Sequence, residues 1–256
     1  MSIYFPQSAA EWLPIIVPIA AMLIGLAYFL APAAMLRLIG LSGSQRHPHA
    51  TGEARASFAG FPFGLGLSSI LFGQPLLLMV LGVAFALAAF GKAVHVIADG
   101  ARMMLVLIRL VLVVVLAVIA LFQTGFEPPQ FVAPASGAGW AIAVVAAVTA
   151  AFGLVCLVLP GQALRLLRLE RAADRPAAHG ELRGLVAGFY LVTGLSVLAY
   201  GGIFLHLALG ICWAAAAFGR MIHMLSDGAN DGYNWLMLVA NLAMAAIPLA
   251  IVFGAV

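Results

Sequence analysis

Charged residues are scarce in this 256-residue chain: they make up 8% of it, whereas hydrophobic residues make up 65%. A soluble globular domain carries roughly a quarter of its residues as charges. The alternation of apolar and polar residues that marks a half-buried strand is also missing, and Ala and Leu dominate. The composition therefore excludes a soluble domain and predicts an all-α integral membrane protein.

Cysteine is rarer still. The two cysteines, Cys156 and Cys212, both lie in apolar stretches, and neither has a counterpart in the other half of the chain. This pattern favours small buried packing residues over a disulfide. No nucleophile elbow, Walker loop or dinucleotide fingerprint occurs. The sequence therefore identifies no catalytic residue and predicts no metal and no cofactor, while enzymatic activity stays open.

The apolar residues fall into eight stretches, most of them near the ~20 residues that a spanning helix needs. Two stretches, 57–72 and 185–200, are shorter. We expect eight spans, at 13–31, 57–72, 76–97, 103–122, 140–159, 185–200, 203–225 and 233–253.

Positive charge gives the expected orientation. Under the eight-span reading all twelve Lys and Arg residues fall at one membrane face, and the other face has only Glu11 and Glu127. The positive-inside rule then places the Arg-rich loops in the cytoplasm and both chain ends outside. The net charge of +3 reflects this topology and does not predict nucleic-acid binding.

The sequence contains an internal repeat with a period of 128 residues. Residues 90–101 read FGKAVHVIADGA and residues 218–229 read FGRMIHMLSDGA, and 22 of 50 positions are identical between 52–101 and 180–229. The boundary falls in the Pro- and Gly-rich segment 123–138. We predict two tandem four-helix bundles, residues 1–128 and 129–256, as parallel repeats about an axis along the membrane normal. The three-residue and two-residue turns at 73–75 and 201–202 predict tightly packed antiparallel hairpins.

Each copy keeps a polar stripe, with a cation, a histidine and an aspartate on one helix face. A second stripe of small residues, including Gly82 and Gly210, predicts a close helix-packing seam. Upstream, GEAR at 52–55 and GELR at 180–183 add a glutamate and an arginine. An aspartate at a helix C-terminus needs a cationic partner, and we expect it from the same copy: His95 and Arg55 for Asp99, and His223 and Arg183 for Asp227.

Two interpretations of this pattern stay open: a structural charge cluster, in which the cations snorkel and the glutamates favour helix dipoles, or a ligand or proton site. Arg109, well inside the fourth span, is the best candidate for binding an anionic group, with snorkelling or an internal salt bridge as the alternative. The candidate residues are Glu53, Arg55, Lys92, His95, Asp99, Arg109, Glu181, Arg183, Arg220, His223 and Asp227.

The FG[KR]xxHxxxDG run, with the upstream GExR and AGF, resembles the bacterial membrane family catalogued as domain of unknown function 4345, here in tandem. The resemblance implies small four-helix bundles in a bacterial inner membrane and no particular activity. Three functions remain: binding of a lipid headgroup or a partner protein, transport of an ion or small molecule between the repeats, and membrane-embedded catalysis.

Overall fold

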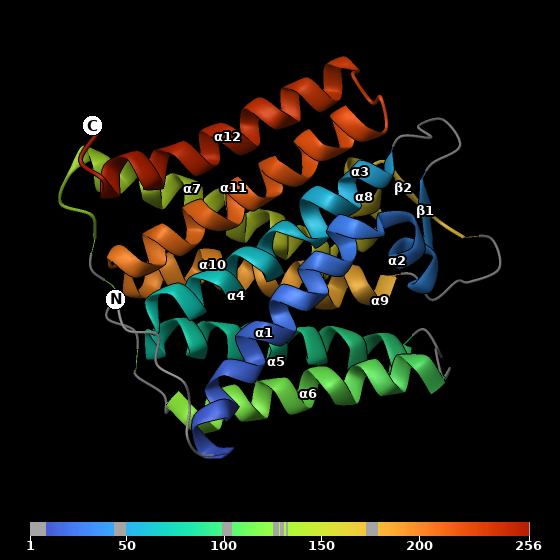
Figure 1. Cartoon of the computed structure of the whole chain (residues 1–256), viewed down its shortest axis with the longest axis horizontal. Helices are drawn as coiled ribbons and strands as arrows, with labels where there is room; N and C mark the ends of the chain where they lie inside the picture. The colour runs from blue at the N-terminus through green and yellow to red at the C-terminus, as the bar shows by residue number, and fades with distance from the viewer. Residues whose placement is uncertain are drawn as a thin grey trace.

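The computed structural model describes residues 9–43, 50–98, 104–124, 128, 131, 133–172 and 179–255, and these are almost entirely helical (Figure 1). The first half contains α1 (Ala9–Leu30), α2 (Pro32–Leu38), β1 (Leu41–Gly43), α3 (Thr51–Glu53), a π-helical turn (Ala54–Phe58), α4 (Gly60–Phe72), α5 (Pro75–Ala98) and α6 (Met104–Thr124). The second half contains α7 (Gly137–Val158), α8 (Pro160–Leu166), β2 (Leu169–Arg171), α9 (His179–Glu181), a π-helical turn (Leu182–Val186), α10 (Ala187–Tyr200), α11 (Ile203–Ser226) and α12 (Gly232–Val252).

Seven helical segments of the described chain are long and apolar enough to cross a membrane, so the chain is an all-α polytopic membrane protein. The expected span at 57–72 does not reach that length, because α4 has only 13 residues and a turn at Ala59 separates it from the helical residues before it. Its counterpart is continuous from His179 to Tyr200 and does qualify. Helix length therefore supports seven of the eight expected spans.

The helices of the two halves interleave. Besides packing on the helix that follows it, α5 packs extensively on α10 of the other half, and α11 packs in the same way on α4. The order α1–α4–α11–α12–α7–α10–α5–α6 closes into a ring of contacting helices. The tight hairpin packing expected for α4 with α5 and for α10 with α11 is wrong, since those pairs touch only lightly. The division at residue 128 stays a prediction about the sequence, but the packing runs across it.

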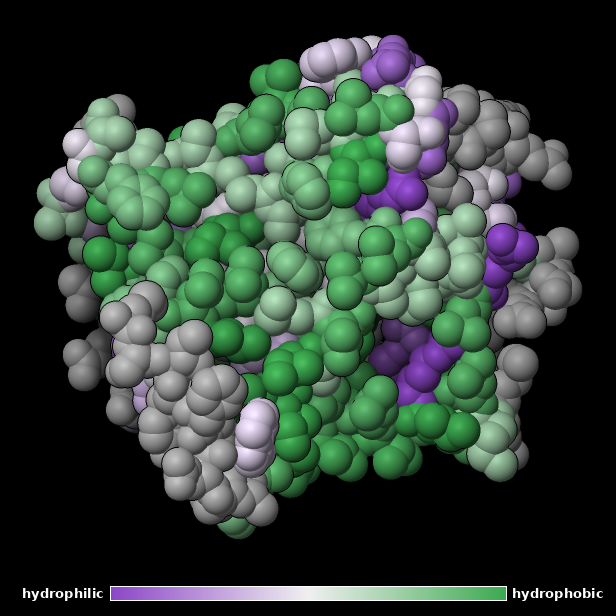
Figure 2. Space-filling view, in the orientation of Figure 1, coloured by the Kyte–Doolittle hydropathy of each residue, from purple (hydrophilic) through white to green (hydrophobic). Residues whose placement is uncertain are grey.

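Apolar side chains cover the outside of this ring. The outward faces of α1, α6, α7 and α12 expose large residues such as Leu23, Val111, Trp140 and Leu236. The space-filling view is mostly hydrophobic, with hydrophilic surface collected towards one end (Figure 2). That end holds α2, α3, α8, α9 and the two strands, whereas α1 and α7 begin, and α12 ends, at the other (Figure 1). Such a surface suits lipid rather than water.

The two halves also meet through equivalent residues. Strands β1 and β2 pair antiparallel in the register Leu41↔Arg171, Ser42↔Glu170 and Gly43↔Leu169. Residues 41–43 and 169–171 lie 128 positions apart, so each strand pairs with its own counterpart around Ser42 and Glu170. A π-helical turn follows Glu53 and Glu181 alike. Wide turns of this kind are rare and occur often at functional sites.

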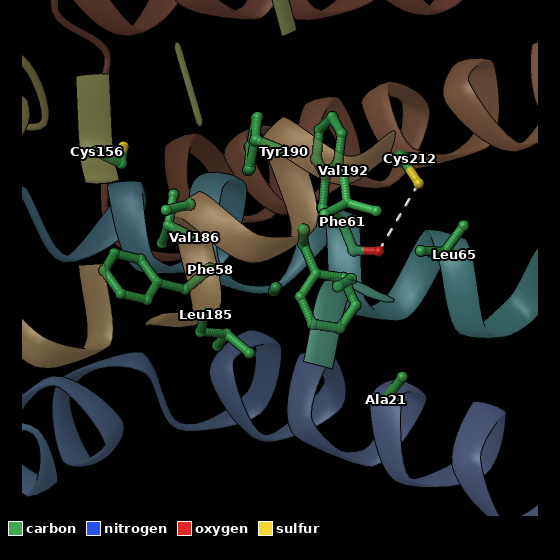
Figure 3. Packing of buried hydrophobic residues seen from close by; sticks show 14 of the residues in the cluster. Ala21, Phe58, Phe61, Leu65, Cys156, Leu185, Val186, Tyr190, Val192 and Cys212 are labelled. Carbon is green, nitrogen blue, oxygen red and sulfur yellow. Dashed lines mark hydrogen bonds between the residues drawn. The ribbon is translucent and has the colours of Figure 1, made fainter. Parts of the chain in front are cut away.

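Small residues bring the helices close together, as predicted. A Cβ atom on Gly82 would lie 2.9 Å from the Cβ of Ala120 on α6, and one on Gly210 would lie 2.6 Å from the side chain of Leu249 on α12. Both cysteines are buried, and the Cys212 thiol faces the carbonyl oxygen of Phe61 at 3.7 Å (Figure 3). The packing role expected of these residues is confirmed.

Candidate functional site

The first charge cluster, the Glu53 cluster, joins Glu53 and Arg55 of the first half to the polar end of α11. Arg220 donates to both carboxylate oxygens of Glu53, at 2.8 and 2.9 Å. Both side chains are only 3% exposed. The same guanidinium donates to Asn234 Oδ1 at 3.1 Å. A paired, hydrogen-bonded geometry of this kind is what allows two charges to be buried.

The outer part of the Glu53 cluster is built on Asp227. Its Oδ2 lies 2.6 Å from His223 Nδ1 and accepts a hydrogen bond from Arg55 Nη1, also at 2.6 Å. Ser226 donates to the other carboxylate oxygen at 3.0 Å. Burial opposes ionisation of Asp227, but the hydrogen bonds from His223 and Ser226 and the charge of Arg55 outweigh it, so its pKa lies below its usual value.

One expectation for this pairing is confirmed and one is wrong. His223 is a partner of Asp227, as the four-residue spacing predicts. The arginine, however, is Arg55 from the other half, and not Arg183. The physical reason is the interleaved packing, which lays the π-helical turn after Glu53 against α11.

The second cluster, the Glu181 cluster, repeats the arrangement with the halves exchanged. Glu181 binds Lys92 of α5 and also faces Arg109 of α6, with Arg109 Nη1 at 3.4 Å from its Oε1. Arg109 donates as well to the carbonyl oxygen of Leu38 at 2.9 Å. The Lys92 side chain is 5% exposed and that of Arg109 is 19% exposed. Two cations thus meet one carboxylate among the described residues of this cluster.

The glycines of the repeated motifs explain why the halves fit so closely. A Cβ on Gly52 would lie 1.9 Å from the ring of His223, and one on Gly180 would lie 2.4 Å from the ring of His95. A Cβ on Gly91 or on Gly219 would lie 2.2 Å from the carbonyl oxygen of Arg183 or Arg55, respectively. The glycine of each GExR motif therefore packs directly against the histidine ring of the other half, where no larger residue would fit without a shift.

The structure places most predicted residues in these two clusters and changes the interpretation of several. Lys92 and Arg220 do not snorkel to the membrane surface, because each is buried against a glutamate of the other half. His95 is also buried and packs on Gly180, whereas His223 packs on Gly52, so the two histidines belong to different clusters. The side chain of Arg183 is half-buried and its backbone packs on Gly91. Asp99 lies outside the described residues.

One element of the site was missed by sequence reasoning. Tyr233 donates to the carbonyl oxygen of Leu166 at 2.9 Å, just as Arg109 donates to that of Leu38, the equivalent residue. The donors themselves are not equivalent in the repeat, so a comparison of aligned positions could not find them. The described part of the chain brings together no group of three or more residues that could hold a metal ion.

Comparison of the chain with known protein families, curated proteins and solved structures finds no match. The resemblance to the bacterial membrane family stays a prediction, and the two clusters are the basis for a function.

Proposed function

We propose that this chain is a bacterial inner-membrane protein that binds the headgroup of an anionic lipid at the Glu181 cluster. The observation that carries the proposal is the position of Arg109. It is the partly exposed member of a cluster in which two cations share one carboxylate.

The surroundings of Arg109 support a headgroup site. Its helix, α6, is among the least buried of the candidate spans and exposes Ile108 and Leu112 on either side of it. Its guanidinium reaches Leu38 at the end of α2, where the polar end of the molecule begins. Figure 2 shows a hydrophilic hollow over the ends of α5 and α6, surrounded by hydrophobic surface. Basic pockets between spanning helices at such a depth suit acidic headgroups.

Arg109→Gln tests the proposal. We expect the wild-type protein to bind phosphatidylglycerol more tightly than phosphatidylcholine, and the variant to lose about fivefold in that preference, because a cation near the lipid surface contributes ~1 kcal/mol. Native mass spectrometry of the protein with defined lipids gives the measurement.

The control is Arg37→Gln, which removes an exposed arginine of α2 that bonds its own helix at Ala33. A wild-type protein without lipid preference would contradict the proposal. Equal losses in the two variants would also contradict it, because they would reflect only the general positive charge of this end.

We extend the proposal to eight spans, with both chain ends outside the cytoplasm. The helical residues 51–72 run alongside α1 and α11 and cover as many positions as 179–200, although a turn at Ala59 interrupts them. All Lys and Arg residues fall outside the segment that joins the halves. A Pro128→Cys protein in intact cells should be labelled by a membrane-impermeant reagent, and labelling only after permeabilisation would reject this orientation.

Transport between the halves and catalysis in the membrane are the alternatives. A relay shared by the two histidines loses support, because His95 and His223 rest in separate clusters. Uptake of an ion or small molecule into liposomes that contain the protein, abolished by His223→Gln, would favour transport over headgroup binding.

A further inference from the structure

A cavity of about 290 Å³ lies between α7, α8, α11 and α12, beside the Glu53 cluster. It lies beside the charge cluster that the proposed headgroup site does not use, and residues of both halves line it. Several aromatic side chains line its apolar walls and its inner end is polar, a combination typical of sites for small organic ligands.

The aromatic walls come from three packed helices. Tyr190 of α10 lies between Phe152 of α7, with ring centroids 4.9 Å apart, and Trp213 of α11, at 5.8 Å. The Trp213 indole N–H already donates to Thr149 at 3.0 Å, so the ring serves the cavity as an apolar surface. Walls built from rings suit a flat, apolar ligand.

The polar end offers hydrogen-bond donors and no net charge. Arg220 lines the cavity and is buried, and its Nε has no hydrogen-bond partner among the described residues. Its charge is neutralised by Glu53, which lines the same end. Asn241 also lines the cavity, is 7% exposed, and has no side-chain hydrogen bond to the part of the chain that the structure describes. An N–H left unpaired in a buried site favours a ligand with an acceptor oxygen.

The entrance faces the hydrophobic surface. Val148 of α7 and Leu166 of α8 line the cavity and are 50% and 58% exposed. Towards the polar end of the molecule, Tyr233 bonds the carbonyl oxygen of Leu166, and the Arg168–Asp231 ion pair lies beside it. A ligand would therefore enter from the lipid with its apolar part outermost.

We propose that this cavity binds a neutral, flat molecule with a carbonyl oxygen on an apolar body, the chemistry of a quinone ring or an aromatic ketone. The carbonyl oxygen accepts from Arg220 Nε and the Asn241 amide, the ring lies among Phe152, Tyr190 and Trp213, and any apolar tail extends past Val148 into the membrane. The proposal is independent of headgroup binding at the Glu181 cluster.

The test compares two probes of the same shape, menadione, which carries carbonyl oxygens, and methylnaphthalene, which carries none. Binding to the full chain in lipid nanodiscs is measured by titration calorimetry. We expect saturable menadione binding, about tenfold weaker binding of methylnaphthalene, and about a tenfold loss of menadione affinity in Asn241→Val, since each removes a hydrogen bond to a buried group. Valine is already present at the equivalent position of the first half, Val113, so the variant should fold.

Filling the cavity gives a second, independent test. Val148→Trp should abolish menadione binding, whereas Val144→Trp, one helical turn away and also exposed, should leave it unchanged because Val144 does not line the cavity. Equal binding of the two probes would show partitioning into lipid and overturn the proposal. Menadione binding that survives in Val148→Trp would overturn it as well.

Discussion

The Glu53 cluster and the Glu181 cluster occupy equivalent places and share one plan, yet they differ in what they leave available. In the Glu53 cluster, Arg220 and Glu53 bind each other through two hydrogen bonds and are both buried. In the Glu181 cluster, one carboxylate serves Lys92 and the partly exposed Arg109. The position equivalent to Arg109 in the second half is Met237, which lines the cavity instead.

This difference separates the residues that hold the two halves together from the residues that could bind a ligand. The parts that both clusters share, a glutamate, a buried cation and a histidine resting on a glycine, hold the two halves together. The parts that differ, Arg109 on one side and the aromatic cavity with Asn241 on the other, are where the halves have become specialised. The repeated residues are thus the less informative ones for ligand chemistry, although they are the most conspicuous in the sequence.

The largest effect should come from breaking the buried ion pair. Glu53→Gln leaves Arg220 charged and buried without its partner, and we expect the free energy of unfolding to fall by about 3–5 kcal/mol. Glu181→Gln should lower the free energy of unfolding by less. One of the two cations that it pairs, Arg109, is partly exposed and keeps its hydrogen bond to Leu38. Steric trapping in bilayers would measure both.

Adding Arg220→Gln to Glu53→Gln should recover part of that loss, because the unpaired charge is then removed as well. Equal costs for the two glutamate variants would show that the clusters do not differ in burial energetics.

The next effect concerns what the clusters share. Gly52→Ala and Gly180→Ala should each lower the free energy of unfolding by about 1–3 kcal/mol, because the new Cβ collides with the ring of His223 or His95. Gly161→Ala is the matched control, since nothing lies within 4 Å of a Cβ there. If either glycine tolerated alanine as well as Gly161 does, the close histidine contact would be ruled out for that cluster.

The smallest effect is the pH dependence of Asp227. Its pKa is lowered in the folded protein, so its contribution to stability is present above the usual aspartate pKa of ~3.9 and is lost as the pH falls through the folded value. Because the side chain is 35% exposed, we expect the free energy of unfolding of the wild type to exceed that of Asp227→Asn by no more than about 1 kcal/mol near pH 7. The melting temperatures of the two proteins should converge at acidic pH. A difference in melting temperature that widens there would contradict the pairing of Asp227 with Arg55 and His223.

Much of this fold could be predicted from residues alone, and the main omission has a physical cause. The length and composition of the apolar stretches predicted the helices. The stripes of small residues predicted the close helix contacts at Gly82 and Gly210. The spacing of His223 and Asp227 gave their contact. The identity of the arginine partner was beyond reach, because GEAR and GELR offer the same side chain to either copy. Only the packing of α11 on α4 decides between Arg55 and Arg183.

The glutamate of each half pairs with a cation of the other half, and this has a consequence for the order of events during synthesis. Glu53 leaves the ribosome 167 residues ahead of Arg220, the side chain that neutralises it. At ~5–20 residues per second, that interval is on the order of ten seconds or longer. Throughout it the nascent first half holds a carboxylate whose final partner does not yet exist, so the Glu53 cluster is completed only after α11 and the first turn of α12 have been synthesised.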